Sequence, residues 1–140
     1  MKQSVSIGNK KVIEQRYLQL QMLAEHIKQM QLQLQQLDAQ VGELTQTHQA
    51  LSEFAEVEQG SDILVALAGG IFTKAKLGDS KEIIVNIGGR TAITKTIPAV
   101  QDMLSEQISE IRKAEVEMTK QLQTLAVQAE QIQEELASMA

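Results

Sequence analysis

The residues that could carry chemistry in this sequence are few and lie far apart. The chain contains no cysteine and two histidines, His26 and His48, so it offers neither a thiolate nor a disulfide framework. His48 has no second histidine and no carboxylate at the spacing of a metal site. No nucleophile stands next to a base, and nothing indicates a concave pocket. We therefore predict no catalytic residue, no metal ligand and no cofactor, and we expect that the chain is not an enzyme.

Two glycine pairs, Gly69-Gly70 and Gly88-Gly89, are the other candidates for chemistry, because glycine-rich loops can cradle phosphates. A dinucleotide fingerprint requires a third glycine and a following helix, and a P-loop requires a lysine followed by serine or threonine. Neither pattern is present, and strand-like residues follow both pairs. We interpret the glycine pairs as hairpin turns.

The composition favours narrow apolar seams over a thick core. Aromatic residues make up 2% of the 140 residues, so few bulky rings are available to fill an interior. The net charge of −5 argues against a nucleic-acid partner, which would require concentrated lysine and arginine. The sequence has neither the apolar run of a signal peptide at its start nor the apolar length of a membrane span. We expect a cytoplasmic protein without a membrane partner.

A heptad pattern predicts a long first helix over residues 12–59. Apolar residues are spaced alternately by three and four, and a mean spacing of about 3.5 residues is typical of a left-handed coiled coil. About 45 residues rising ~1.5 Å each would form a rod of roughly 70 Å. Gly60 and Ser61 are expected to end it. The seam positions are Ile13, Arg16, Leu20, Leu23, Ile27, Met30, Leu34, Leu37, Val41, Leu44, His48 and Leu51.

A second heptad pattern predicts a helix over residues 98–139, with Thr96 as its N-cap and Pro98 in its first turn. The two seams have nearly equal length, so we expect them to pair antiparallel. The register in which paired residue numbers add to 152 places Ile13 beside Met139, and a register one heptad away stays open. The seam positions are Leu104, Ile108, Ile111, Glu115, Met118, Leu122, Leu125, Ala129, Ile132, Leu136 and Met139.

Three polar residues interrupt the seams, namely Arg16, His48 and Glu115. Arg16 lies near the open end of the helix pair, where its aliphatic stem can cover apolar surface while its head stays in water. We interpret His48 as a residue that sets the register at a cost in stability, rather than as a ligand. His26 lies off the seam and is expected to face solvent.

Four short runs between the helices predict two β-hairpins. The runs cover residues 62–68, 71–77, 81–87 and 90–97, and glycine-containing turns separate them. An isolated hairpin is marginal in water and leaves its edges open to other chains. We therefore predict that other subunits bury one apolar face and that the hairpins close a shared small barrel. The residues of this face are Ile63, Val65, Leu67, Ile71, Phe72, Ile83, Val85, Ile87 and Ile93.

With these elements the chain resembles a prefoldin subunit of the α class, and the resemblance covers residues 12–139. It rests on the equal heptad arms, on the two hairpins, and on ILVAL at residues 63–67, GIFTKAKL at 70–77, and IVNIG at 84–88 followed by TKT. The family usually has proline where Ala66 stands, and Gly-x-Gly where this chain has Gly88-Gly89-Arg90. The expected fold is one prefoldin-like domain over residues 1–140, mainly α with a small β insert. It is a long antiparallel two-helix coiled coil with two central β-hairpins, over residues 62–97, that form an intersubunit β-barrel.

The resemblance also implies a function and partners. It implies a hexamer of two α and four β subunits, whose hairpins close into a double β-barrel from which six coiled coils hang. It further implies an ATP-independent chaperone, a holdase, that captures unfolded proteins at the coiled-coil tips and passes them to a group II chaperonin. The competing hypothesis is a structural tether or adaptor whose tip binds one specific folded partner.

Apolar residues outside the seam gather near the expected free ends of the helices. A flexible tail over residues 1–11 contributes two of them, and others fall at outward heptad positions, Val127 of the second helix among them. A cluster of apolar residues at the end of a rod, beside half-open seam residues, is typical of a binding surface. The predicted client-binding residues are Val5, Ile7, Val12, Ile13, Tyr17, Leu18, Met22, Ile132, Leu136 and Met139.

Overall fold

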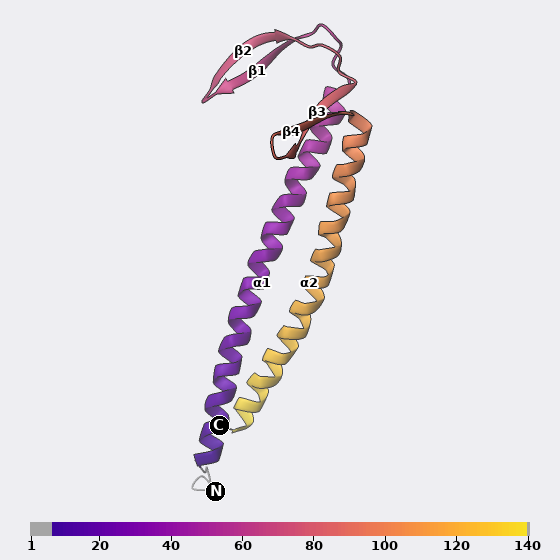
Figure 1. Ribbon diagram of the computed structural model, residues 1–140. Coiled ribbons are helices and arrows are strands. Elements are labelled where there is room, and N and C mark those ends of the chain that lie inside the picture. The colour runs from indigo at the N-terminus through magenta and orange to yellow at the C-terminus, as the bar shows by residue number, and fades with distance from the viewer. Residues whose placement is uncertain (1–6, 140) are drawn as a thin grey trace. The chain divides into compact units, whose positions relative to one another are not determined.

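The computed structural model describes residues 7–139 and contains two long helices separated by four short strands (Figure 1). The predicted fold class is confirmed: the chain is mainly α, with a small β insert of two antiparallel hairpins. The elements are α1 (Ile7–Phe54), β1 (Asp62–Ala68), β2 (Ile71–Lys76), β3 (Glu82–Gly88), β4 (Thr91–Thr96) and α2 (Ile97–Met139). The predicted client residue Val5 lies outside the described residues.

The chain divides into two compact units, which we describe separately. The first, the arm unit, combines α1 up to Gln40 with α2 from Ile111 onward. The second, the hairpin unit, runs from Val41 to Glu110 and holds the rest of both helices together with all four strands. Both helices therefore contribute to both units, and each unit has its own stretch of the seam.

The first helix begins earlier than predicted. α1 starts at Ile7 rather than at residue 12, so residues 7–11 are helical and do not belong to a flexible tail. Lys10 and Lys11 are good helix formers, and they can extend the helix beyond its first seam residue without burying any surface. The heptad pattern missed this turn because apolar periodicity marks only the part of a helix that packs.

The first helix also ends earlier than predicted, at Phe54 rather than at residue 59. Beyond it, the amide of Glu56 donates to the carbonyl oxygen of Glu53 at 3.2 Å, a bond between residues three apart that tightens the last turn. Gly60 then adopts a φ of 86°, which glycine takes without a steric penalty. The chain turns there toward β1.

The second helix starts where its capping residues predict. α2 begins at Ile97, and the Thr96 hydroxyl oxygen accepts a hydrogen bond from the amide of Ala99 at 3.3 Å. This bond satisfies one of the first amides of the helix, which have no partner inside it. Pro98 occupies the first turn, where its missing N–H costs nothing.

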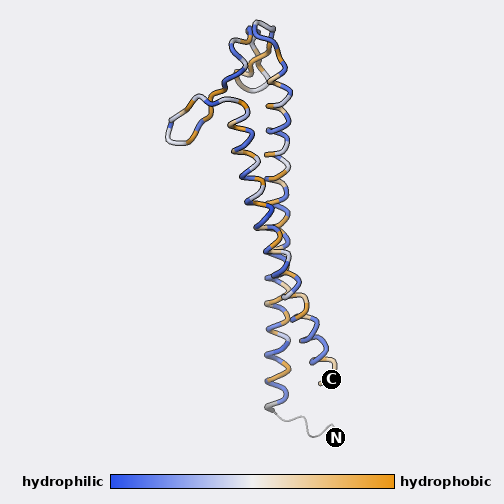
Figure 2. Tube along the Cα trace, turned by 90° about the vertical axis from the view of Figure 1, so that its right-hand side faces the viewer, coloured by the Kyte–Doolittle hydropathy of each residue, from blue (hydrophilic) through white to orange (hydrophobic). Residues whose placement is uncertain are grey.

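In the arm unit, the heptad positions of the two helices form the seam. Every seam residue from Ile13 to Leu37 of α1 is half-buried or buried, and all positions between them are exposed. The same alternation holds from Ile111 to Leu136 of α2, and Figure 2 shows hydrophobic residues recurring along both helices. Met30 and Leu136 are the most buried, at 5% and 9% exposure. The predicted two-helix coiled coil is therefore confirmed.

Ion pairs between the helices agree with the predicted antiparallel register. In the arm unit, Arg16 pairs with Glu135 at 3.0 Å, and Asp38 pairs with Arg112 at 3.4 Å. Both pairs of residue numbers add to within two of 152, whereas a shift by one heptad would change the sum by seven residues.

In the hairpin unit, a polar link joins the two helices. The buried apolar residues of this unit, between 3% and 7% exposed, are Val41, Ile97 and Val100. The side-chain amide of Gln101 donates to the His48 carbonyl oxygen at 3.2 Å and to the Ser52 hydroxyl oxygen at 2.7 Å. The sequence analysis missed Gln101, and the link uses the backbone of His48 rather than its ring.

The two hairpins share one construction, displaced by 20 residues. β1 pairs with β2 and β3 pairs with β4, in two separate antiparallel sheets. In each hairpin one residue bulges out before the turn, Leu67 in the first and Ile87 in the second. Both turns contain two residues with positive φ, Gly69-Gly70 at 39° and 83° and Gly89-Arg90 at 57° and 64°. The second turn is thus one residue later than the predicted Gly88-Gly89.

We expect His48→Leu to stabilise the coiled coil. The His48 ring is half-buried in the seam and makes no hydrogen bond among the described residues, while Gln101 uses a carbonyl oxygen that the substitution retains. Leucine suits a packed seam and buries more apolar surface. Thermal unfolding followed by circular dichroism should show a free energy of unfolding that is higher by roughly 1 kcal/mol.

Gln49→Leu is the matched control, because it places a leucine at the neighbouring exposed position. It should shift the free energy of unfolding by less than about 0.5 kcal/mol. A lower melting temperature for His48→Leu would contradict the prediction and would show that the imidazole ring has a partner of its own.

Candidate functional site

Each hairpin has two distinct faces, which follow from its register. Directly opposed residues of antiparallel strands project from the same face, and successive residues alternate between faces. In the first hairpin, the apolar face carries Ile63, Val65, Thr73 and Ala75. The opposite face, which we call the mixed face, carries Asp62, Leu64, Ala66, Phe72, Lys74 and Lys76.

Phe72 was predicted to share a face with Val65, and the register shows that it does not. The register pairs Phe72 with Ala66, so its ring, 58% exposed, projects from the mixed face together with Leu64, which is 67% exposed. Because residues of a strand alternate, Phe72 points away from the side that its neighbour Ile71 occupies. The apolar face predicted from the sequence therefore combined residues of both faces of the hairpin.

The second hairpin repeats this arrangement. Ile83 and Val85 of β3 are half-buried on its apolar face, as is Ile93, which lies opposite Val85. Lys95 lies on the same face, opposite Ile83. Ile84, which is not among the predicted interface residues, projects from the mixed face and is 76% exposed. Both hairpins thus present apolar residues on both sides.

The predicted interface residues are largely uncovered within the chain. Ile63, Ile83, Val85 and Ile93 are half-buried. The others are exposed, with Val65 at 40%, Leu67 at 65%, Ile71 at 63%, Phe72 at 58% and Ile87 at 55%. A two-stranded hairpin is marginal in water, and a large exposed apolar surface is typical of an interaction site.

The free ends of the helices carry a second group of exposed apolar residues. These are Val12 at 38%, Tyr17 at 55%, Leu18 at 56%, Met22 at 65%, Val127 at 52% and Met139 at 40%. Ile13 and Ile132 are half-buried seam residues, and the side chain of Ile7 lies outside the described residues. Leu136 corrects our prediction: it is 9% exposed and closes the seam instead of standing half open.

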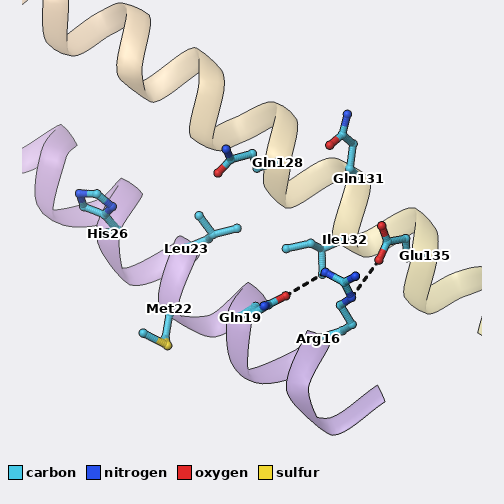
Figure 3. Close-up of a pocket in the computed structure, with 9 residues that line it drawn as sticks. All are labelled: Arg16, Gln19, Met22, Leu23, His26, Gln128, Gln131, Ile132 and Glu135. Atoms are coloured by element: carbon cyan, nitrogen blue, oxygen red, sulfur yellow. Dashed lines mark hydrogen bonds and ion pairs between the residues drawn. The ribbon is translucent and has the colours of Figure 1, made fainter. Parts of the chain in front are cut away.

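An open groove lies between the helices of the arm unit (Figure 3). Its volume is about 630 Å³, within the range of ligand-binding clefts. The guanidinium group of Arg16 pairs with the Glu135 carboxylate at 3.0 Å and donates to the side-chain oxygen of Gln19 at 3.0 Å. Leu23 and Ile132 point toward each other from the two helices. We expected no concave pocket from the sequence, and this expectation is wrong for the arm unit.

Two smaller hollows lie in the same unit. One, of about 330 Å³, is lined by His26, which also lines the groove, together with Met30 and other residues of both helices. His26 is exposed, as predicted, but it borders both hollows rather than bulk solvent alone. The other, of about 130 Å³, is lined by Ile13 and Met139 among others, which agrees with the predicted register at the helix ends.

The described residues offer neither a cluster of metal ligands nor a helix that could span a membrane. Between residues 9 and 139, no group of three or more histidine, cysteine, aspartate or glutamate side chains could hold a metal ion. No helix in that part of the chain is both long and apolar enough to cross a membrane.

Comparison with known protein families agrees with this geometry. The family described as "Prefoldin subunit" matches residues 23–140, which include the hairpins, all of α2 and most of α1. The chain belongs to the prefoldin subunit family. The resemblance that rested on two heptad arms and two hairpins is confirmed.

Among the relatives of this prefoldin subunit are α subunits from archaea. It is 26% identical to prefoldin subunit alpha of Archaeoglobus fulgidus over 132 residues, which cover 94% of this chain and 96% of that protein. It is 29% identical to prefoldin subunit alpha of Methanococcus aeolicus over 124 residues, which cover 89% and 84% of the two chains. These relatives support the predicted α class.

A solved structure shows the same fold. The cryo-EM structure of filamentous PFD from Methanocaldococcus jannaschii matches this prefoldin subunit with a TM-score of 0.73 and 15% identity. The match covers 82% of this chain and 95% of the other. As a prefoldin subunit, the chain is a chaperone subunit, and the prefoldin family is not a family of enzymes. The client-binding and interface residues named above stay predictions.

Proposed function

We propose that this prefoldin subunit acts as an ATP-independent holdase. It assembles with β-type subunits into a hexamer of two α and four β chains, captures unfolded proteins at the free ends of its helices, and passes them to a group II chaperonin in the cytoplasm. One observation carries the proposal: large exposed apolar side chains gather at two places in the chain, on the hairpins and at the helix ends.

The hairpins are suited to assembly. Each sheet has two strands, so each hairpin has unpaired edges and no second layer to cover it. A barrel closed by hairpins of several subunits pairs these edges and buries the apolar faces. Val65 and Val85 would then face the interior, and Ile84 and Phe72 the outside. Lys95, at one end of the apolar face, is long enough to reach the mouth of the barrel with its charged head.

The helix ends are suited to unfolded clients. Tyr17, Leu18 and Met22 project from outward heptad positions near the end of α1, and Val127 does so in α2. Covering one such side chain contributes about 1–2 kcal/mol. Several arms that act on one client multiply weak contacts through effective concentration. The thioether of Met22 repacks easily against different partners.

We further propose that the chaperone works without nucleotide and without catalysis by this chain. Gly69-Gly70 forms the tight turn between β1 and β2, and Gly89 lies in the turn between β3 and β4, while Gly88 is the last residue of β3. A phosphate loop instead directs its backbone amides toward the ligand and leads into a helix.

Val85→Asp should block assembly while the helices stay formed. Val85 lies on the apolar face opposite Ile93, and a carboxylate buried there without a partner costs several kcal/mol. Sedimentation of the chain co-expressed with a β-type subunit should show loss of the hexamer, with an unchanged helical signal in circular dichroism. An unchanged hexamer mass would contradict the shared barrel.

Ile84→Asp is the matched control for this experiment. It places the same charge one residue away, on the mixed face, where Ile84 is 76% exposed. Because the proposed barrel leaves this face outside, the variant should assemble. Equal loss of the hexamer in both variants would show that the assignment of inner and outer faces is wrong.

Removing exposed apolar side chains at the helix ends should strongly weaken client binding. The triple variant Tyr17→Ser, Leu18→Ser, Met22→Ser changes side chains that are 55%, 56% and 65% exposed, so stability should hardly change. Losing about 1 kcal/mol of contact at each should weaken the affinity for a denatured client roughly a hundredfold. Light scattering of several unrelated denatured proteins, with and without ATP, measures how well aggregation is suppressed.

Leu32→Ser with Val116→Ser is the matched control, because these residues of the arm unit are 50% and 57% exposed but lie farther from the helix ends. This variant should protect clients as the unchanged protein does. Equal loss in both variants would place the client surface along the arm rather than at its end. An unchanged protein that suppresses aggregation of none of the clients would favour the tether hypothesis.

A further inference from the structure

The apolar face of the second hairpin, formed by β3 and β4 (Figure 1), carries a lysine among its apolar residues. Lys95 lies opposite Ile83, and Val85 and Ile93 share its face. Lysine is seldom covered in folded proteins, yet Lys95 is half-buried. Its ammonium group forms no ion pair or side-chain hydrogen bond with any described residue. A cation therefore stands without a counterion on the face that we expect other subunits to cover.

The charged groups near Lys95 do not neutralise it. Glu82 lies at the same end of the hairpin, but it pairs with Thr96 in the register and projects from the mixed face. Lys81 directly precedes β3 and adds a second positive charge at this end. The first turn of α2, which follows closely, contains no acidic residue, and the N-terminal end of a helix favours anions over cations. A counterion for Lys95 must therefore come from outside the described residues.

The first hairpin shows that this type of hairpin forms without the lysine. The two hairpins have the same construction displaced by 20 residues, so Ala75 of β2 occupies the position that Lys95 occupies in β4. Ala75 pairs with Ile63 just as Lys95 pairs with Ile83. Because alanine suffices for the local structure, the charge of Lys95 matters chiefly for the surface that covers the second hairpin.

Copies of this chain cannot supply the missing counterion from their own apolar faces. Residues 62–96 contain three acidic side chains, of which Asp62 and Glu82 project from the mixed faces. Asp79 lies in the connection between the hairpins, where its carboxylate accepts a hydrogen bond from the amide of Lys81 at 2.9 Å. A barrel closed only by hairpins of this chain would therefore have lysines on its inner wall and no carboxylate. Covering unpaired like charges in this way is costly.

We propose that Lys95 selects the subunit that covers the second hairpin. That subunit is of the β type, and its hairpin presents a carboxylate to the ammonium group from its own inward face. The inference rests on the proposed assembly into a shared barrel, and it adds which residue distinguishes the right partner from a copy of this chain. A covered ion pair contributes little net stability, but the loss of either charge is strongly destabilising. Such a pair excludes wrong neighbours more than it strengthens the right one.

Lys95→Glu tests the proposal, because it should place two carboxylates against each other. In the protein co-expressed with a β-type subunit, the concentration at which half of the hexamer dissociates should rise roughly a hundredfold or more. Analytical ultracentrifugation measures this concentration, and circular dichroism checks that the helices stay formed. Lys74→Glu is the matched control, because it makes the same change at an exposed position of the mixed face. This control variant should assemble as the unchanged protein does.

A zero-length cross-link can identify the partner's carboxylate. A carbodiimide joins a lysine amine to a carboxylate with which it is in contact, and mass spectrometry should find Lys95 joined to an acidic residue in the hairpin of the β-type subunit. Lys95→Arg keeps the charge and should form the hexamer without this cross-link, because a guanidinium group stays protonated and does not react as an amine. Replacing the identified carboxylate by lysine should restore assembly of the Lys95→Glu variant.

The chain on its own provides a second readout. Lys95→Leu removes the charge that keeps copies of the second hairpin apart, and it adds apolar surface to the same face. Without a β-type subunit, this variant should form larger assemblies than the unchanged chain at equal concentration. Equal masses of the two proteins would overturn the exclusion of copies by Lys95.

The outcomes distinguish this inference from the assembly itself. If Lys95→Glu assembles as tightly as the unchanged protein, or if no cross-link joins Lys95 to the partner, the selective role is overturned and the shared barrel stands. If Lys74→Glu loses the hexamer to the same extent, the total charge of the hairpins governs assembly and the role of Lys95 is again overturned. If the unchanged chain forms no hexamer with the β-type subunit, both proposals fall.

Discussion

The apolar residues of the two hairpins cannot be buried within this chain, and this constraint governs the rest of the structure. Each sheet has only two strands, too few to form a core of its own. Phe72 and Ile84 project from faces opposite to those of Val65 and Val85, so folding one hairpin onto a single surface would still leave apolar side chains in water. We propose that other chains supply the missing surface. The helices, in contrast, bury their seams against each other and leave their outward residues available for a different task.

The three polar residues of the seam differ in the partners that their side chains have. Glu115 has a side chain that is 17% exposed and pairs with Arg112 at 3.3 Å, and Arg112 also reaches Asp38 across the helices at 3.4 Å. That cluster gives the seam carboxylate of Glu115 a cationic partner. The ring of His48 has no such partner among the described residues, and only its backbone takes part in the link to Gln101. Arg16 pairs across the seam with Glu135 at 3.0 Å, donates to Gln19 of its own helix, and lines the groove of the arm unit.

Much of this fold could be predicted because its signals are local. The heptads, the Thr96 cap and the glycine turns each depend on residues close in sequence, and the predicted register follows from two seams of equal length. The faces of the hairpins could also have been separated, since strict alternation places Phe72 opposite to Ile71. The bulges and the 20-residue displacement were likewise readable, because DILVALAG at residues 62–69 matches EIIVNIGG at 82–89. Three features could not be predicted from the sequence, namely the Gln101 link, the burial of Leu136 and the groove. Each of them depends on how one side chain reaches across to the other helix.

The hairpins and the helix ends both expose apolar side chains, but the two surfaces differ in how stiff these side chains are. The hairpins present mostly β-branched residues such as Ile71, Ile84 and Ile87, whose restricted rotamers suit one fixed complementary partner. The helix ends present Leu18 and Met22, together with the glutamine amides of the groove. None of these side chains is branched at Cβ, so they can repack against many sequences. A permanent interface gains from stiffness because little side-chain entropy is lost when it forms. A surface that must accept many unfolded chains gains from the opposite property, since a rigid surface would fit only a few of them.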